Sequence, residues 1–257
     1  MNIAFKCTYN DADEDVYVGF NGTCSAGNII RNIKAGRVWC SSEECACRKY
    51  HDAGFTGRRP RYPCYESRLF CNWRFGSGVY QHGERAGLPI GIHRVESGDV
   101  AVLTTRFPGD NEKSRKVIGL FRVSRIEQQE GIIVYAASEY RLRLPLEEAR
   151  YLAFWDYYSV ESEQPDWRSG LARYLTDAAV AKLLTDLKDT LRNEADRIVV
   201  TRLLTERYGH IDRAAFPEGM LQQELSRADT LARARKYGSG GEGEEHRKLK
   251  EWIAGHP

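Results

Sequence analysis

Several features that identify common protein classes are missing from this sequence. No stretch approaches the roughly twenty apolar residues of a membrane-spanning helix, and no apolar run of secretory-signal length precedes residue 30. There is no Walker loop and no G-x-S-x-G. No HxxxH or HNH-type arrangement offers a catalytic metal site, and no D…(D/E)xK cluster follows residue 243. We therefore expect a cytoplasmic protein with no membrane partner and no catalytic residues in this chain.

The composition is that of an ordinary globular protein, but the cysteines are unevenly distributed along the chain. It has 257 residues, of which 42% are hydrophobic and 29% charged, with a net charge of +2. This length allows one large domain or two small ones. Five of the seven cysteines lie between Cys40 and Cys71, yet no C-x-x-C occurs, so the paired knuckles of a zinc ribbon are absent.

The cysteine-rich stretch predicts a metal centre. Four thiolates close a tetrahedral site for a soft or borderline metal, and short spacings deliver two ligands at little cost in loop closure. The expected metal is Zn²⁺ or a [4Fe-4S] cluster. Free buried thiols are the main alternative, because a cytosolic chain rarely keeps disulfides. The predicted ligands are Cys40, Cys45, Cys47 and Cys64, with Cys24 and Cys71 in reserve, whereas Cys7 alternates with Phe5 and Tyr9 on an expected strand.

The same stretch is strongly basic and rich in aromatic residues. From Arg48 to Arg74 there are seven Arg or Lys residues and two Asp or Glu residues. Such a patch on a nearly neutral chain is typical of phosphate binding, and interleaved aromatics can stack a base. A solvated loop whose arginines pair with distant carboxylates is the competing interpretation. The predicted nucleic-acid contacts are Lys49, Arg58, Arg59, Arg61 and Arg74, and the predicted base pocket is Trp39, Trp73, Tyr80, Thr104, Thr105 and Arg106.

Hydrophobic patterns predict a β-rich first half. Residues 2–9 and 15–20 read as strands around an acidic turn, and residues 28–36 as a short helix followed by an extended RVWC. The cysteine-rich stretch reads as irregular, and residues 76–98 as a loop. Residues 98–145 contain three strands. A helix is expected from Pro145, ending in the aromatic block FWDYY, which we expect to pack back on the sheet.

These strands resemble those of the PUA-like superfamily, which includes the EVE, ASCH, YTH and SRA domains. The resemblance rests on a Gly-Asp turn before one strand and a V-I-G-x-F-x-V run in the next, namely Gly98, Asp99, Val117, Ile118, Gly119, Phe121 and Val123. It covers residues 1–20 and 89–158. It implies an α+β fold with a PUA-like β-barrel that carries the Cys-rich segment as an insertion. It also implies nucleic-acid binding, in several members with a modified base flipped into an aromatic pocket.

The second half of the chain is expected to be helical. Val180, Leu183, Leu184, Leu187 and Leu191 form one apolar stripe, and Val199, Leu203 and Leu204 a shorter one. A flexible linker, GSGGEG, then precedes EEHRKLKEWIA, which resembles the first helix of PD-(D/E)xK nuclease domains. The expected domains are therefore 1–160, β-rich with the insertion at about 24–75; 161–237, helical; and 238–257, a linker and the start of a further, incomplete domain.

Together these observations predict a DNA-binding specificity module of a modification-dependent restriction system, which recognises a modified or flipped base. RNA is an alternative target, and the helical segment could form a homodimer. One competing hypothesis is a metal-dependent nuclease or RNA-modifying enzyme that uses His82 and His93. Another is an iron–sulfur redox-sensing DNA-binding regulator.

Overall fold

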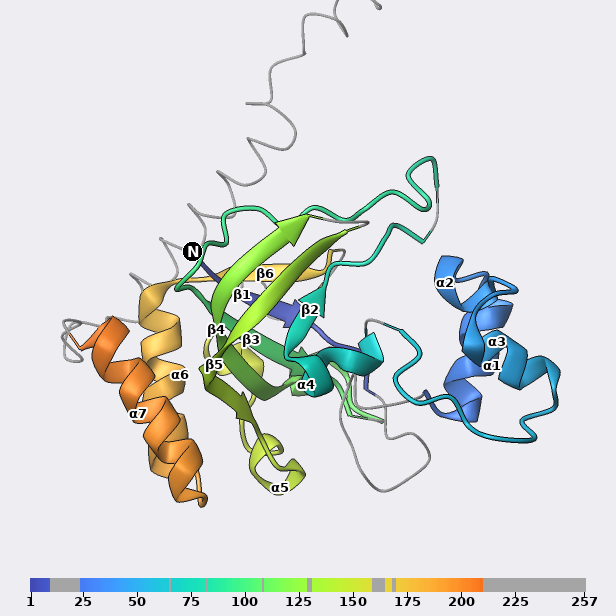
Figure 1. The fold of residues 1–257 in the computed structure, drawn as a ribbon. Helices are drawn as coiled ribbons and strands as arrows, with labels where there is room; N and C mark the ends of the chain where they lie inside the picture. The colour runs from blue at the N-terminus through green and yellow to red at the C-terminus, as the bar shows by residue number, and fades with distance from the viewer. Residues whose placement is uncertain are drawn as a thin grey trace, which may run out of the picture.

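A curled six-stranded sheet forms the centre of the molecule (Figure 1). The computed structural model describes residues 1–9, 24–64, 66–81, 83–107, 109–128, 131–158, 165–167 and 170–209. The strands follow the order β2-β5-β4-β3-β1-β6, so that the sheet is half of a barrel. Their bounds are β1 Asn2–Lys6, β2 Arg74–Gly76, β3 Val100–Thr105, β4 Lys116–Gln128, β5 Ile132–Arg143 and β6 Ala172–Leu175.

The three strands expected between residues 98 and 145 are confirmed as β3, β4 and β5, which pair antiparallel. Strand β3 is buried along its whole length. Gly119 in β4 permits a close approach of β5, since a Cβ atom there would lie 2.5 Å from the carbonyl oxygen of Leu142. The Gly98–Asp99 turn before β3 uses a positive φ of +94° at Gly98. The clearest sequence pattern therefore corresponds to strands that are buried and closely packed.

The sixth strand corrects a prediction. Residues 162–176 read as helical, but Ala172–Leu175 form β6, which pairs antiparallel with β1. An unpaired β1 would leave a row of backbone groups open at the sheet edge, and β6 satisfies them. Thr176 then ends the strand and begins the next helix, because its hydroxyl accepts a hydrogen bond from the Ala179 amide at 3.1 Å.

Two long helices, α6 (Asp177–Thr190) and α7 (Glu194–Tyr208), complete the sheet's core. The stripe expected along α6 is buried, whereas in α7 the buried residue is Val200 in place of Val199. Helix α7 is fastened by an ion pair between Arg207 and Asp99 at 2.8 Å. One hydrophobic cluster includes residues of the strands and of both helices, so the boundary expected near residue 160 does not separate two cores.

The helix expected from Pro145 is much shorter than predicted. Helix α5 spans Leu146–Ala149, and the chain then extends before a 3-10 turn at Phe154–Asp156. The amide of Val117 bonds the carbonyl of Leu152, and the amide of Phe154 bonds the carbonyl of Arg115. In residues 152–154, backbone hydrogen bonds to residues at the start of β4 therefore take the place of the hydrogen bonds of a longer helix. Phe154 is fully buried, and the aromatic block packs back on the sheet as expected.

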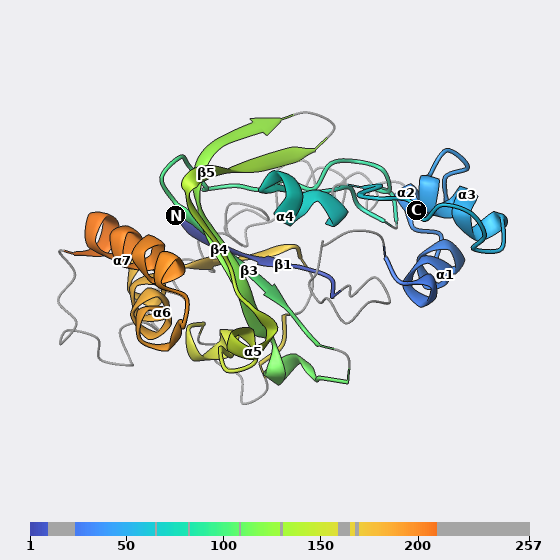
Figure 2. The same cartoon turned by 60° about the horizontal axis from the view of Figure 1, so that its bottom comes forward.

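Residues 24–64, which we call the Cys-rich lobe, stand apart from the sheet (Figures 1 and 2). Three short helices, α1 Ala26–Lys34, α2 Val38–Ser41 and α3 Ala46–Asp52, pack mainly against one another. The helix predicted at 28–36 is confirmed as α1, whereas the extended RVWC and the irregular cysteine stretch were wrong predictions. A 3-10 turn at Glu66–Arg68 and helix α4 (Leu69–Asn72) lead from the lobe back to β2.

Three expectations fall outside the described residues: the strand at 15–20, the helical residues beyond 209, and the linker with the nuclease-like helix at 238–257. Within the described residues, no helix combines the length and the apolar character needed to cross a membrane.

Candidate functional site

Five cysteines gather inside the Cys-rich lobe, and each comes from a different position in its fold. Cys24 precedes the N-cap residue of α1, Cys40 lies in α2, and Cys45 is the N-cap residue of α3. Cys47 lies in the first turn of α3 and is buried, and Cys64 ends the lobe. We call these five residues the thiol cluster.

The members of the thiol cluster influence one another electrostatically. Burial, followed by the neighbouring Cys45 and Cys64, raises the pKa of Cys40 to about 12. The same three causes raise the pKa of Cys47 to about 12. Burial, then Cys64 and Glu66, raises the pKa of Cys24, and burial with Glu66 raises that of Cys64. Burial therefore favours the neutral thiol form at these four positions.

The predicted metal ligands Cys40, Cys45, Cys47 and Cys64 and the reserve Cys24 all lie in the Cys-rich lobe. Cys71, the other reserve, is exposed on α4, and Cys7 is buried among core side chains as predicted. All seven cysteines are free. Across the described ranges, no three Cys, His, Asp or Glu side chains already have donor atoms positioned about a common metal ion. The five thiols therefore share one lobe, but among the described residues they do not form a group that could hold a metal ion.

Glu66 is the acidic neighbour of the thiol cluster. It is half-buried, and burial raises its pKa to about 7 against the opposing effect of the Arg37 guanidinium. The same carboxyl group raises the pKa values of Cys24, Cys40 and Cys64. The Glu66 carboxyl group therefore lies near three of the five thiols.

The arginines of the lobe divide into exposed and internal groups. Arg58 and Arg61 are exposed and have no ion-pair partner among the described residues. Arg59 is half-buried and donates to the carbonyl of Cys24 at 3.3 Å, so it ties the two ends of the lobe together. Lys49 pairs with Glu44 at 2.8 Å. Arg74 lies in β2, outside the lobe. Of the predicted phosphate contacts, Arg58 and Arg61 are the most available.

The aromatic residues predicted to stack a base are in two places. Trp39 is 42% exposed on α2, and the amide of the preceding Val38 bonds Gln81 Oε1 at 3.0 Å. Tyr80 precedes Gln81, so Trp39 and Tyr80 flank the junction between the lobe and the 77–98 loop. Trp73 lies between α4 and β2, edge-on to Phe70 with ring centres 5.4 Å apart. The bond between Val38 and Gln81 therefore brings the chain next to Trp39 close to the chain next to Tyr80. Trp73 has a separate, half-buried position.

The two threonines proposed for the base pocket are buried inside the sheet. The Thr104 hydroxyl donates to the Phe5 carbonyl at 2.9 Å, and the Thr105 hydroxyl donates to the Cys7 carbonyl at 3.0 Å. Both side chains are fully buried, so they tie β3 to the β1 chain and do not face a ligand at the surface. Arg106, the next residue, is half exposed and lies 3.5 Å from Glu112.

A buried arginine that the sequence did not single out organises this end of the sheet. Arg115 is 1% exposed, and its guanidinium donates from Nε and from Nη2 to the two carboxylate oxygens of Glu112. Its Nη1 donates to Thr104 Oγ1 at 3.3 Å. The guanidinium also lies 4.6 Å from the centre of the Trp167 ring. Arg115 is therefore fixed by a carboxylate, a hydroxyl and an aromatic face.

Further cations surround Arg115. Partial desolvation and the guanidinium groups of Arg115, Arg106 and Arg173 lower the pKa of Lys6, while Glu112 opposes them. Arg173 lies over the Trp167 ring at 5.3 Å. We call Lys6, Arg106, Arg115, Arg173 and Glu112 the sheet-end patch. Four cations and one carboxylate make it strongly positive.

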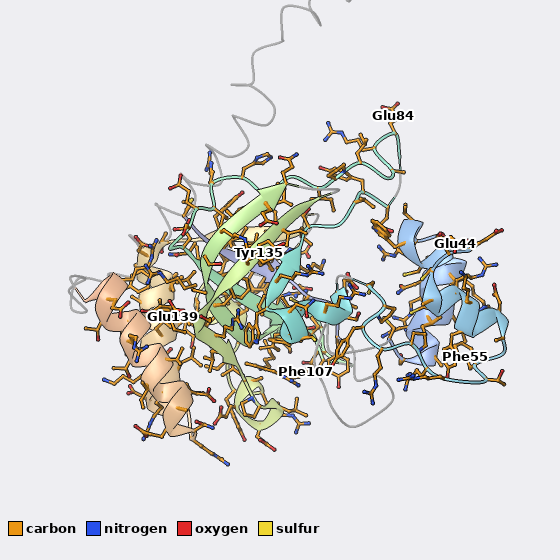
Figure 3. All side chains as sticks on the ribbon, in the orientation of Figure 1. Glu44, Phe55, Glu84, Phe107, Tyr135 and Glu139 are labelled. Carbon is orange, nitrogen blue, oxygen red and sulfur yellow. The ribbon has the colours of Figure 1, made fainter. Side chains whose placement is uncertain are left out.

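The sheet-end patch faces the side of the molecule that carries the lobe. Strand β1 ends at Lys6 and runs towards the lobe in both ribbon views (Figures 1 and 2). Phe107, which follows Arg106, is seen between the sheet and the lobe (Figure 3). The aromatic rings of Trp155 and Trp167 border the patch, and Trp155 Nε1 donates to the Glu112 carbonyl at 2.6 Å.

Sequence reasoning missed this patch for an identifiable reason. Arg115 sits in the polar run NEKSRK, which resembles an exposed loop, and Lys6 and Arg173 are isolated in separate strands. Only the pairing of β1 with β3 and β6 brings them together. The Glu-x-x-Arg spacing of Glu112 and Arg115 was the available signal. His93 is exposed, and His82 lies outside the described residues.

Comparisons with protein-family models, with curated proteins and with solved structures gave no match for this chain.

Proposed function

We propose that this protein is a DNA-binding module that holds the phosphate backbone at the sheet-end patch and stacks a base on the aromatic residues beside the lobe. The observation that carries the proposal is the concentration of Lys6, Arg106, Arg115 and Arg173 around the single carboxylate of Glu112. Phosphate groups are the common partners of such an excess of positive charge, and arginine binds them bidentately.

The exposed arginines of the lobe add a second basic surface. Residues 24–64 contain eight Lys or Arg residues and three Asp or Glu residues, although the whole chain has a net charge of only +2. Arg58 and Arg61 extend from the loop after α3 and are free of ion pairs within the described part of the chain. Duplex DNA offers phosphates spaced along both surfaces. We therefore assign both surfaces to one DNA ligand.

Trp39 is the side chain best suited to stack a base. It is 42% exposed, whereas Trp73 is half-buried against Phe70 and the Arg141 guanidinium. Tyr80, across the lobe junction, is the second candidate. A base that is modified or flipped out of the duplex needs an aromatic face of this kind. The curled sheet and the Gly98–Asp99 turn are compatible with a PUA-like domain, whose members bind nucleic acids, and this supports a role in recognising modified DNA for restriction.

Binding to fluorescent duplex DNA over a series of salt concentrations tests the phosphate contacts. The double variant Lys6→Ala with Arg106→Ala removes two exposed charges without disturbing Arg115. We expect weaker binding to every sequence and a logarithmic salt slope smaller by about 2. The matched control is Lys188→Ala with Arg192→Ala, which removes the same charge from exposed positions at the end of α6. Equal losses in the two variants, or none in either, would remove the patch from the interface.

A second comparison tests base recognition and the choice of DNA. The wild type and Trp39→Ala are measured on duplexes with modified and unmodified bases and on RNA of the same sequence. We expect Trp39→Ala to lose discrimination between modified and unmodified DNA more than total affinity. Loss of both to the same extent would exclude Trp39 as the reading residue, and tighter binding of RNA would overturn DNA as the ligand.

A further inference from the structure

A hairpin projects from the sheet on the side of the Cys-rich lobe, and Glu84 lies at its outer end (Figures 1 and 3). The structure describes it at residues 78–81 and 83–90. An antiparallel bridge between Val79 and Pro89 joins its two arms, and the amide of Tyr80 donates to the carbonyl of Leu88 at 2.9 Å. Backbone bonds therefore fix the hairpin before any ligand binds. We call it the 78–90 hairpin.

The 78–90 hairpin holds an apolar side chain in water. Leu88 is 54% exposed, whereas every other leucine in the described part of the chain is at least partly buried. Pro89 beside it is exposed as well. A single exposed apolar side chain is common at protein surfaces, so its surroundings decide whether it has a task. Here the side chain stands on a fixed backbone, and contact with a ligand would remove its apolar surface from water.

The 78–90 hairpin is fastened to the helix that carries Trp39. Gln81 makes the connection, because its Oε1 accepts from the amide of Val38 at 3.0 Å and its Nε2 donates to the carbonyl of Val79 at 2.9 Å. Val38 directly precedes Trp39 in α2, and the Trp39 side chain is 42% exposed. The exposed aromatic side chain and the exposed leucine therefore belong to the two sides of one junction.

The charge beside this junction is mainly positive. Arg37, at the start of α2, is exposed, and the guanidinium of Arg85 in the hairpin lies 5.8 Å from the centre of the Tyr80 ring. Glu84 is the acidic residue of the hairpin, whereas residues 24–64 on the other side contain eight Lys or Arg residues against three Asp or Glu residues. A DNA duplex matches an apolar tip on a basic surface, since its phosphates lie outside an apolar stack of bases.

We propose that Leu88 is a wedge that enters the base stack of DNA next to the base that Trp39 stacks. This assignment rests on the proposed function and adds the residue that opens the duplex. Apolar side chains inserted at a base step partly unstack it and kink the duplex. The fixed hairpin suits this role, because little freedom is lost when the wedge is bound. Leu88 fills the gap that a flipped base leaves behind.

Fluorescence of 2-aminopurine in the DNA tests the wedge, because this base brightens when it loses its stacking neighbours. Duplexes with one 5-methylcytosine, one 5-hydroxymethylcytosine, one N6-methyladenine or no modification each carry 2-aminopurine at the adjacent step. The full chain is added to saturation, and we expect a several-fold rise on the duplex that it binds most tightly. Leu88→Ala should lose most of this rise and about tenfold in affinity, since it removes the apolar surface placed against the bases.

Two further variants control this measurement. Ile198→Ala removes a side chain of similar exposure, 50%, from α7 and should keep both the rise and the affinity of the wild type. Leu88→Phe keeps an apolar wedge and should keep the rise. Because Leu88 is exposed, the thermal midpoint of Leu88→Ala by circular dichroism should equal that of the wild type, which separates binding from folding.

The possible failures point to different errors. An equal rise in Leu88→Ala and the wild type would overturn Leu88 as the wedge. Wild-type protein that binds DNA with a salt-dependent affinity and leaves 2-aminopurine unchanged on all four duplexes would also overturn the wedge, while the proposed function would stand. Wild-type protein that binds none of the duplexes would overturn both.

Discussion

The sheet and the Cys-rich lobe are stabilised by different means within one chain. The sheet buries aromatic and aliphatic side chains from all six strands and from α6 and α7 in one cluster. The lobe, whose secondary structure consists of three short helices, buries only Ile29 and Cys47 among its hydrophobic residues. Hydrophobic burial scales with the apolar area removed from water, so it can account for the sheet but not for the lobe. The lobe therefore needs a source of stability other than apolar packing.

Metal removal should separate the two regions most clearly. Structural zinc contributes on the order of 10 kcal/mol to small metal-dependent folds. We expect a chelator to abolish amide protection throughout α1, α2 and α3 while β3, β4 and β5 stay protected. Hydrogen exchange followed by mass spectrometry measures both regions in one sample. Uniform loss of protection would mean that the lobe and the sheet unfold as one unit, and unchanged protection would mean that the lobe needs no metal.

The reciprocal change is Phe5→Ala in the sheet. Phe5 is fully buried, and its ring stacks on Phe75 with centres 3.8 Å apart. Truncation of a buried Phe costs about 3–5 kcal/mol. Chemical denaturation followed by circular dichroism should show this loss, with the metal content unchanged. The comparison variant Ile29→Ala, in α1, should leave the denaturation midpoint of the sheet where it is in the wild type.

The buried ion pair at the sheet end should have a smaller effect. Arg115→Ala leaves the carboxylate of Glu112, whose side chain is 19% exposed, without its main partner. Removal of one member of a buried pair costs about 3 kcal/mol or more, and the partial exposure of Glu112 places this variant at the low end. Thermal unfolding measures the loss. The double variant Arg115→Met with Glu112→Gln should recover part of it; a double variant less stable than Arg115→Ala would contradict the ion-pair explanation.

The same contrast explains how much the sequence could predict. Local patterns located β3, β4, β5, the stripe of α6 and the helix α1, because each of these is set by the spacing of its own apolar residues. They failed at β6 and at residues 150–154, whose backbone partners lie in β1 and β4. Cysteine spacing located the Cys-rich stretch, but it predicted an irregular chain where the structure has α2 and α3.

The candidate interface was predictable only in part for the same reason. The lobe arginines Arg58, Arg59 and Arg61 are close together in the sequence, so the sequence alone predicted their basic patch. The sheet-end patch combines Lys6, Arg106, Arg115 and Arg173, and only strand pairing reveals it. Thr104 and Thr105 were placed at the correct end of β3, yet strand periodicity did not show that both hydroxyls bond the β1 chain.

The smallest effect on stability, and the sharpest separation of binding from folding, is expected for Arg58→Ala with Arg61→Ala. Both side chains are exposed and unpaired within the described residues, so the free energy of unfolding should change by less than about 0.5 kcal/mol. Under the proposed function, the logarithmic salt slope of DNA binding should fall by about 2. Arg59→Ala is the informative contrast, because Arg59 bonds the Cys24 carbonyl and should affect the fold of the lobe before it affects DNA. If Arg58→Ala with Arg61→Ala left DNA binding unchanged while the sheet-end variant weakened it, DNA would contact the sheet alone, and the lobe would have a different task.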